Sequence, residues 1–422
     1  MACVERICAN LDAHLVAAAL ETSKAYQKQF FSALEKTNMI DFRQEKQREL
    51  GVAVNPRDET QRTHVLAALA DAEKVSKQLL LGLEDEKVVE ESVLAAESLS
   101  QLYYSCGLYD KSLEILNKLK KLDMPEHQML AVSWGHLACS ILLGEADEAI
   151  SELTQLRDLL DASSLDKFSL LKNRSWLLHW SLFVFFFLSP NEDSKPSLAG
   201  PTMFLDFVFQ DKYMNALQTT NLHLLPYVIF SVVVLNRSAS YSRRNVLSEV
   251  KKIVRFQNES TSSDPFVGFF SGIFMEFDFQ VSLKNLHACG ELLKQDPFLG
   301  SYRHLFLEEA SVLYFEAYCR VHEVIDVALV QEIKKIDGPS LSVEQAKAWV
   351  NELIRQNRID AKIHSDNRII VDCTFPSLHQ KVIDRTKAFA SRSAFMLAAL
   401  DRVVDEQDTP NADIDERLER TE

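Results

Sequence analysis

The feature that most constrains the fold of this chain is its scarcity of helix breakers. Its 422 residues include only 11 glycines and 11 prolines, and no proline lies between Pro56 and Pro125 or between Pro125 and Pro190. Proline lacks a backbone donor and clashes with the preceding turn, and glycine costs backbone entropy, so both are rare inside helices. Such long breaker-free stretches, rich in Ala, Leu, Glu and Lys, predict a mostly helical chain.

A weak internal repeat predicts how these helices are arranged. One copy begins at Gly107 and another at Gly144, 37 residues later. Glycine suits a tight turn between two helices, where a positive φ is often required. A small residue follows each glycine at the fifth position, and aliphatic residues follow at the sixth and ninth positions: Ser112, Leu113 and Leu116, then Ala149, Ile150 and Leu153. A period of this length is typical of tetratricopeptide-like helical hairpins, which stack to bury a continuous core.

Two weaker copies extend the repeat. One begins at Phe277 and the other at Asp211. The matching positions are Ser282, Leu283 and Leu286 in the first of these copies, and Ala216 and Leu217 in the second. Nearby, Gly268 and Gly272 form a GxxxG pair, which we interpret as close helix packing or a turn because no membrane-length segment surrounds it. We therefore expect a helical-repeat solenoid.

The pattern changes at about residue 300. Residues 307–320 and 325–333 read as helices, and Ser342 caps a third helix with Gln345 at the reciprocal capping-box position. Two short β-like runs follow, at 359–363 and 368–371, joined by a polar segment. Three helices followed by a β-hairpin predict a winged helix.

The charges of this winged helix argue against a nucleic-acid reader. Its third helix carries two acidic and two basic residues, and a reader needs a basic helix to contact phosphates. We therefore expect it to serve assembly instead, by pairing an exposed hairpin edge near 368–371 with the sheet of a neighbouring subunit. This makes Ile369 and Val371 candidate partner-binding residues, and direct nucleic-acid binding is not expected.

A terminal helix is predicted between residues 376 and 405. Its apolar seam follows heptad spacing at Val382, Thr386, Phe389, Ser393, Met396, Leu400 and Val403. A second stripe lies beside the seam at Ile383, Ala390, Ala394, Leu397 and Val404. Two apolar flanks exceed what docking on one surface requires, so we expect this helix to be sandwiched, with its own domain on one flank and partner helices on the other. The candidate partner-binding residues are Val382, Phe389, Met396, Leu397, Leu400 and Val403. The alternative is a helix folded wholly onto its own core.

The composition excludes several classes of function. The formal charge is −15, which disfavours binding of nucleic acid or anionic membranes by charge alone. The seven cysteines are scattered and form no CxxC pair, and the histidines form no HExxH or HxH motif. No phosphate-binding glycine loop and no nucleophile elbow occurs. We therefore expect no catalytic, cofactor-binding or metal-binding residues.

Two apolar runs, at 176–188 and 222–235, are shorter than the roughly 20 residues of a membrane span. We interpret both as buried core helices and His179, inside the first, as a packing residue. No membrane association is expected. The reduced cysteines and the missing signal peptide indicate a cytosolic or nuclear protein, and of these two we expect a cytoplasmic location.

Helical repeats that lead into a winged helix and a terminal helix resemble the PCI-domain family of scaffold proteins. Specific blocks are similar to one branch of it, the e-subunit family of eukaryotic translation initiation factor 3. Among them are TNMIDF at 37–42, SWGHLA at 133–138, RSWLLHWSLFVFF at 174–186 and YMNALQT at 213–219. Further blocks are FEAYCRVH at 315–322, WVNELIRQNRIDAKI at 349–363 and VIDRTK at 382–387.

The resemblance implies a non-catalytic scaffold subunit of initiation factor 3. Its implied partners are other PCI subunits such as c and l, the d subunit, a bundle of C-terminal helices and the 40S small ribosomal subunit. The region from about 65 to 97, the 190–201 loop and the acidic tail depart from the family pattern. Two other hypotheses stay open: a PCI subunit of the proteasome lid or COP9 signalosome, and a nucleic-acid-binding winged-helix protein.

These patterns divide the chain into five predicted regions. N-terminal helices occupy 1–70, a helical-repeat domain 71–299, and the winged-helix part of a PCI domain 300–375. A C-terminal assembly helix follows at 376–405. The last 22 residues carry nine acidic and three basic residues, so a disordered acidic tail is predicted at 406–422.

Overall fold

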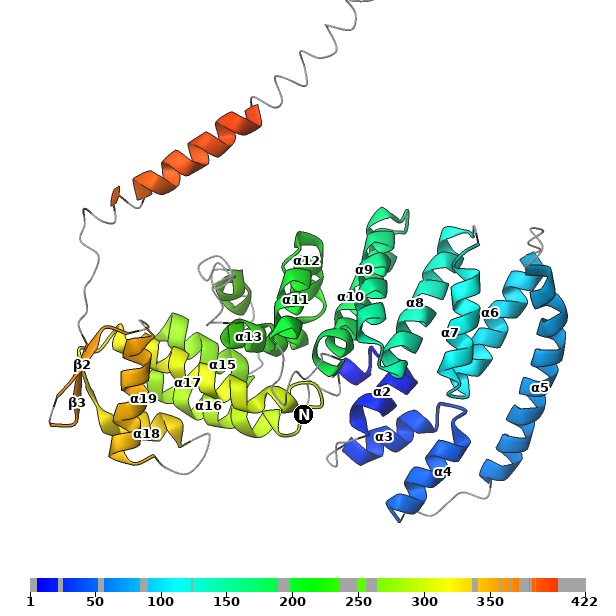
Figure 1. Cartoon of the computed structure of the whole chain (residues 1–422), viewed down its shortest axis with the longest axis horizontal. Coiled ribbons are helices and arrows are strands. Elements are labelled where there is room, and N and C mark those ends of the chain that lie inside the picture. Colours follow the sequence, from blue (N-terminus) through cyan, green and yellow to red (C-terminus); the bar gives the residue numbers. More distant parts are fainter. Residues whose placement is uncertain are drawn as a thin grey trace, which may run out of the picture.

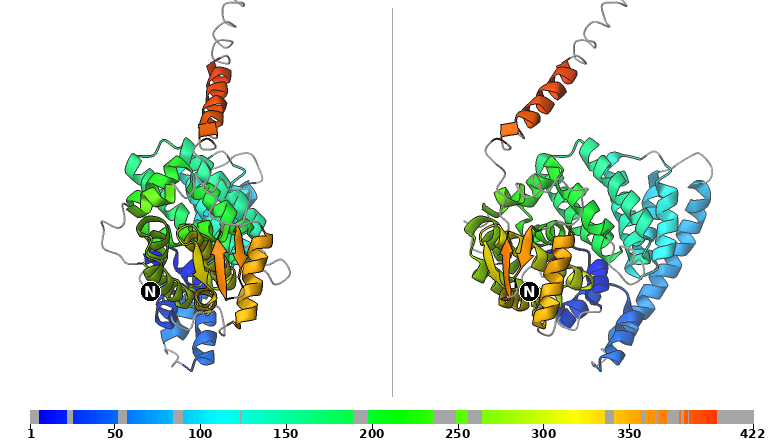
Figure 2. Two further views of the ribbon diagram at one scale, coloured as in Figure 1. Left: turned by 90° about the vertical axis from the view of Figure 1, so that its left-hand side faces the viewer. Right: turned by 60° about the vertical axis from the view of Figure 1, so that its left-hand side comes forward.

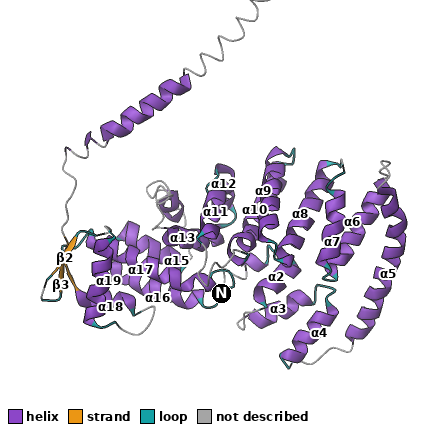
Figure 3. Ribbon diagram, viewed as in Figure 1, coloured by secondary structure: helices purple, strands orange, loops and turns teal. Residues whose placement is uncertain are grey.

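The fold is a row of helices that ends in a small sheet, as a computed structural model of the chain shows (Figure 1). The structure describes residues 6–21, 26–51, 57–83, 90–122, 124–188, 198–235, 249–255, 264–335, 341–356, 359–364, 366–371, 379, 382–383 and 385–400. Helices dominate these residues, and three short strands complete them (Figure 3). The prediction of an all-α chain with a small β element is confirmed.

Three short helices open the chain: α2 (Ala13–Leu20), α3 (Gln27–Leu34) and α4 (Ile40–Glu49). The Asp12 carboxylate caps α2 by accepting a hydrogen bond from the backbone N–H of His14, and it also accepts one from the Tyr104 hydroxyl at 2.7 Å. The His14 Nδ1 lies 3.0 Å from the Tyr109 hydroxyl. These contacts hold α2 against the helices of the repeat region.

The repeat region begins with a long helix and continues as antiparallel neighbours. Each helix from α5 to α9 contacts the next helix along the chain, which for α9 is α10. The helices are α5 (Arg57–Leu83), α6 (Glu90–Ser105), α7 (Tyr109–Leu119), α8 (Glu126–Leu143), α9 (Ala146–Ala162) and α10 (Lys167–Leu182). The predicted boundary between residues 70 and 71 falls inside α5.

The repeat predicted from Gly107 and Gly144 is present in the structure. Both glycines have positive φ, at 81° and 83°, and each lies in the turn between two antiparallel helices. Phe277, at the same position of the third copy, also has a positive φ, of 57°. The small residues at the fifth position are buried in all three copies, as are the aliphatic residues at the ninth: Ser112, Ala149 and Ser282, and Leu116, Leu153 and Leu286.

The second half of the helical row holds the most apolar core. Its elements are the π-helix η2 (Phe183–Phe187), α11 (Ala199–Val208), α12 (Asp211–Thr219), η3 (Leu222–Leu224) and α13 (Leu225–Val234). They are followed by α15 (Pro265–Ser271), the π-helix η5 (Gly272–Glu276), α16 (Phe279–Leu293), η6 (Gly300–Tyr302) and α17 (Arg303–Cys319). Every residue of α13 is buried, and so is most of the run from Leu177 to Phe186. The interpretation of both apolar runs as core helices is confirmed.

The loop predicted at 190–201 is only partly a loop in the structure. The predicted loop at 190–201 ends sooner than expected because α11 already begins at Ala199, with Pro201 in its first turn, where proline is tolerated. Residues 189–197 lie outside the described residues.

Gly268 and Gly272 lie in α15 and η5 and face α16, and a Cβ on Gly272 would lie 2.1 Å from the Ser282 Oγ. The GxxxG pair therefore allows α15 and η5 to pack closely against α16.

The winged helix is present, with one strand that the sequence did not indicate. Its elements are β1 (Val324–Asp326), α18 (Val327–Lys334), α19 (Val343–Arg355), β2 (Ala361–Ile363) and β3 (Arg368–Val371). Ser342 and Gln345 form the predicted capping box at the start of α19. The prediction of a helix from residue 325 was wrong at its start, because Ile325 pairs with Ile369 in β1 and α18 begins at Val327.

The sheet has the order β1-β3-β2, with both pairs antiparallel, and lies at one end of the helical row (Figure 2). The prediction that the hairpin edge lies near 368–371 is therefore wrong. β3 has a neighbour on each side, so its backbone N–H and C=O groups are used within the sheet. Its alternate side chains Ile369 and Val371 are buried in the main core.

Candidate partner-binding surface

The terminal helix carries an exposed apolar surface. Residues 385–400 are helical, every one of them is exposed, and the helix stands apart from the rest of the chain in Figure 1. Phe389, Met396 and Leu400 of the predicted seam are 66%, 68% and 61% exposed. The alternative in which this helix folds onto its own core is not the arrangement in the structure.

Both predicted stripes contribute to this surface. Val382 and Leu397 are exposed as well, whereas Val403 lies outside the described residues. Phe395, which is 78% exposed, was not among the predicted residues. It precedes Met396 by one residue and so lies about 100° around the helix, outside both stripes. A heptad search passes over such a residue, although the run of three large apolar residues at 395–397 is visible in the sequence.

The two candidate partner-binding residues of the winged helix, Ile369 and Val371, are buried. Ile369 is fully buried and Val371 is nearly so, and both contribute to the core beneath the sheet. Between them, Ile370 points to the other face of the strand and is partly exposed. A partner would have to contact the edges formed by β1 and β2, so a direct role of Ile369 and Val371 in binding stays an untested prediction.

A cavity of about 400 Å³ lies between α4, α5 and the turn from α6 to α7. Its walls include Met39, Leu66 and Cys106, so it is largely apolar. Arg62 and Asp41, which both line it, form an ion pair with a separation of 2.9 Å between Nε and Oδ1. Burial raises the pKa of the Cys106 thiol, which disfavours the reactive thiolate.

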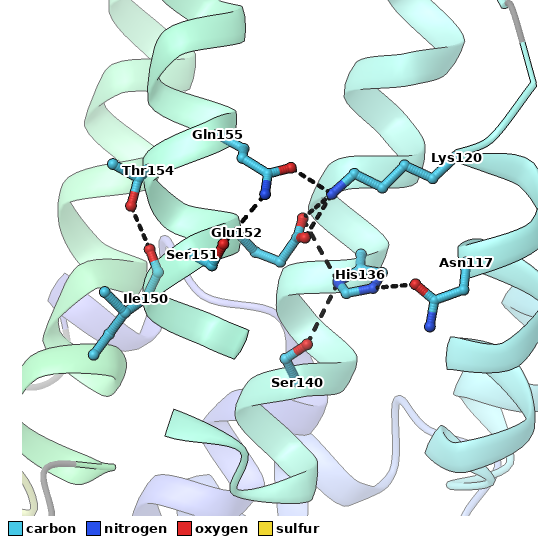
Figure 4. A network of polar contacts seen from close by, with 9 residues as sticks. All are labelled: Asn117, Lys120, His136, Ser140, Ile150, Ser151, Glu152, Thr154 and Gln155. Carbon is cyan, nitrogen blue, oxygen red and sulfur yellow. Dashed lines mark hydrogen bonds and ion pairs between the residues drawn. The ribbon is translucent and has the colours of Figure 1, made fainter. Parts of the chain in front are cut away.

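A network of polar side chains lies inside the repeat region and joins α7, α8 and α9 (Figure 4). The Lys120 ammonium donates to the Glu152 Oε2 and to the Gln155 Oε1, both at 2.7 Å. The His136 Nε2 donates to the Asn117 Oδ1 at 2.8 Å. Burial is the largest influence on His136 and lowers its pKa, although the Glu152 carboxylate acts in the opposite direction. A neutral, buried histidine whose ring nitrogens are bonded holds helices together and is not poised for proton transfer.

A second buried pair joins α10 to η3. The His179 Nδ1 donates to the Ser175 carbonyl at 2.7 Å, so its Nε2 is free to accept a hydrogen bond from the His223 Nε2, also at 2.7 Å. The Asn10 amide lies 3.3 Å from the same His179 Nε2. Burial lowers the pKa of each histidine to about 4. The interpretation of His179 as a packing residue is confirmed by its complete burial.

Neither a metal site nor a membrane span emerges from the described part of the chain. No three His, Cys, Asp or Glu side chains within the described ranges are grouped so that they could hold a metal ion. No single helix among these residues is long and apolar enough to cross a membrane. Two consecutive helical segments, Asp211–Thr219 and Leu222–Val234, are long and apolar enough only when taken together, and the chain bends by 104° between them.

Comparisons with known proteins point to one family. Residues 3–123 match a family model described as "eIF3 subunit 6 N terminal domain". A relative from Arabidopsis thaliana, named as the E subunit of eukaryotic translation initiation factor 3, is 30% identical over 92% of this chain and 93% of its own length. Proteins of the same name from Yarrowia lipolytica and Anopheles gambiae are 31% and 29% identical. Their alignments cover 87% and 94% of this chain, and 89% and 94% of the relatives.

Proposed function

The chain belongs to the E-subunit family of eukaryotic translation initiation factor 3, and from this premise we propose that it is a non-catalytic scaffold subunit of that factor. In this role it binds other subunits and the small ribosomal subunit during initiation of translation. The names of the relatives favour this function over a role in the proteasome lid or the COP9 signalosome.

One observation carries the scaffold role: the terminal helix exposes large apolar side chains on two adjacent stripes. Exposed side chains gain free energy only when a partner covers them, at about 1.5–3 kcal/mol for each one that passes from water to a buried site. Because Phe389, Met396 and Leu400 are about two-thirds exposed, the three can contribute roughly 3–6 kcal/mol before ordering costs. A gain of this size adds to the stability of a complex that other contacts also hold together.

The partners follow from the same proposal. Helices of other subunits, among them PCI subunits such as c and l, would cover the stripes of the terminal helix, and the d subunit would be a further partner. The edges of β1 and β2 suit pairing with a neighbouring winged helix. The protein would work in the cytoplasm on the 40S subunit, and the balanced charges of α19 argue against direct binding of nucleic acid.

The absence of an active site is part of the proposal. The buried histidines His136 and His179 are both engaged in hydrogen bonds that join helices. Both histidines are neutral near pH 7 because burial lowers their pKa. They support the packing of the scaffold.

The test is to replace the three seam residues together and to purify the tagged chain with its partners. Phe389→Ser, Met396→Ser and Leu400→Ser should reduce the recovery of other factor 3 subunits by at least about tenfold, which corresponds to about 1.4 kcal/mol. The melting temperature of the isolated chain should not change, because these side chains are exposed in it.

The matched control places serine on the opposite side of the same helix, at Ala388, Ala398 and Ala399. It introduces the same residue at a similar cost in helix propensity but leaves the stripes intact. Equal recovery of all subunits by the seam variant and the control would refute the assignment of the helix as an assembly element.

A further inference from the structure

Three of the four tryptophans of the chain gather on one surface of the helical repeats. The Trp134 ring of α8 contacts the rings of Trp180 and Trp176 of α10, edge to face, with centroids 4.8 Å and 6.3 Å apart. Phe168, two turns before Trp176 on α10, is 76% exposed. We name these four aromatic residues, with Lys172 between Phe168 and Trp176, the tryptophan face.

This face is the open part of a surface that the chain itself covers elsewhere. α2 packs against α8, and the Asn10 amide reaches His179 near the end of α10. Figure 1 shows α2 beside one end of α8 and α10, next to their C-terminal halves. Phe168 and Lys172 lie in the N-terminal half of α10, Trp134 at the middle of α8, and Trp176 and Trp180 in the C-terminal half of α10. Phe168 and Trp176 remain exposed beside the part that α2 contacts. A short helix, α2, therefore already packs on α8 next to this face.

The charge at the centre of the face is positive. Phe168, Lys172 and Trp176 are spaced four residues apart, so they follow one face of α10 over about 12 Å. The Lys172 Nζ lies 4.7 Å from the centre of the Trp176 ring and, within the described residues, has no carboxylate partner. This ammonium lies between two exposed aromatic side chains, Phe168 and Trp176. It complements an acidic side chain flanked by apolar ones.

A nucleic acid fits this face less well. Base stacking needs a free ring face, but Lys172 covers one face of Trp176, and Trp134 and Trp180 are partly buried against the core. Asp166 and Glu126 at the start of α10 and α8 add negative charge at the rim. A protein segment is therefore the better ligand.

We propose that the tryptophan face binds an amphipathic helix of another subunit, which carries an acidic residue with large apolar residues one turn before and after it. The acidic side chain pairs with Lys172, and the apolar side chains cover Phe168 and Trp176. The inference rests on the proposed function as part of a multisubunit factor. It assigns a second contact, separate from the terminal helix.

The experiment uses the full chain in its purified complex. A photo-crosslinking amino acid in place of Phe168 should capture one segment of one subunit, and that segment should contain an acidic residue with apolar neighbours four residues away. Lys172→Glu should weaken retention of that subunit by about thirtyfold, equivalent to a loss of about 2 kcal/mol. Changing the captured acidic residue to lysine should restore binding to the Lys172→Glu chain.

The control is Lys251→Glu, because the Lys251 Nζ also lies over an aromatic ring, 4.9 Å from the centre of Phe274. It should leave every subunit in place. The double variant Phe168→Ser with Trp176→Ser should weaken retention of the same subunit. If this double variant does not fold, the result for Lys172→Glu alone tests the inference. Wild-type subunit ratios for Lys172→Glu, or a crosslink into RNA, would overturn the inference. If the unaltered chain recovers no factor 3 subunit, the proposed function itself fails, and the inference fails with it.

Discussion

Replacing Gly272 by alanine should destabilise the protein, although alanine usually stabilises helices. Gly272 begins η5 and packs against α16, and a Cβ there would lie 2.1 Å from the Ser282 Oγ and 3.1 Å from the backbone oxygen of Asp278. Real Cβ atoms do not approach other atoms to the first of these distances, and the second neighbour is backbone. The helices must therefore move apart. Overpacking of this kind costs about 1–3 kcal/mol, against a gain of about 1 kcal/mol for alanine over glycine in an exposed helix.

The measurement is thermal unfolding of Gly272→Ala together with hydrogen exchange of α15 and α16. The variant should melt several degrees lower, and exchange should speed up in these two helices first, because the clash lies between them. Gly135→Ala is the matched control: its Cβ would meet the Leu116 Cδ1 at 3.3 Å, and the end of a flexible side chain can yield. A Gly272→Ala protein as stable as the Gly135→Ala control would refute the close packing of η5 on α16.

Two further predictions concern backbone strain and pH. At Phe277, where φ is positive, glycine should be more stable than alanine by about 1 kcal/mol, whereas at the helical position Val281 alanine should be the more stable by a similar amount. Thermal unfolding of the four variants checks this, and the same order at both positions would contradict it. Acid should destabilise the fold through His179 and His223, because a pKa of about 4 lies below the unfolded value near 6.5. This contribution is complete above pH 6.5 and is lost as the pH falls towards 4, by about 3 kcal/mol for His179 at 1.36 kcal/mol per unit. His223→Gln should flatten the dependence of stability on pH in that range, and an unchanged dependence would refute the assignment.

The local features of the fold could be predicted from the sequence. The turns at Gly107 and Gly144 and the capping box at Ser342 depend on residues within a few positions of one another, and the structure has all three. The third copy of the repeat was found even though Phe277 stands where the other copies have glycine, because the buried positions Ser282 and Leu286 kept their spacing.

The errors concern contacts between distant segments. Ile325 continues an apolar run that reads as helix, and it forms a strand because Ile369, 44 residues later, pairs with it. The same pairing places β3 in the centre of the sheet, which no local pattern in 368–371 indicates. Packing of α2 against α8 and the gathering of Trp134 with Trp176 likewise join segments that are far apart in the chain.

The candidate site was predicted unevenly. The heptad spacing from Val382 to Leu400 identified the stripes of the terminal helix, and these residues are exposed in the structure. Spacing alone did not reveal Phe395 or the tryptophan face, because exposure depends on what the rest of the chain covers. The five predicted regions, and the roles of Ile369, Val371 and Val403 in binding, stay predictions.

A scaffold role in initiation factor 3 can be decided by native mass spectrometry of complexes purified through the tagged chain from its own cells. This measurement identifies every partner and its copy number at once. We expect one copy of this chain together with other subunits of factor 3. Recovery of the chain alone, or with subunits of the proteasome lid or the COP9 signalosome, would show that the proposed role is wrong.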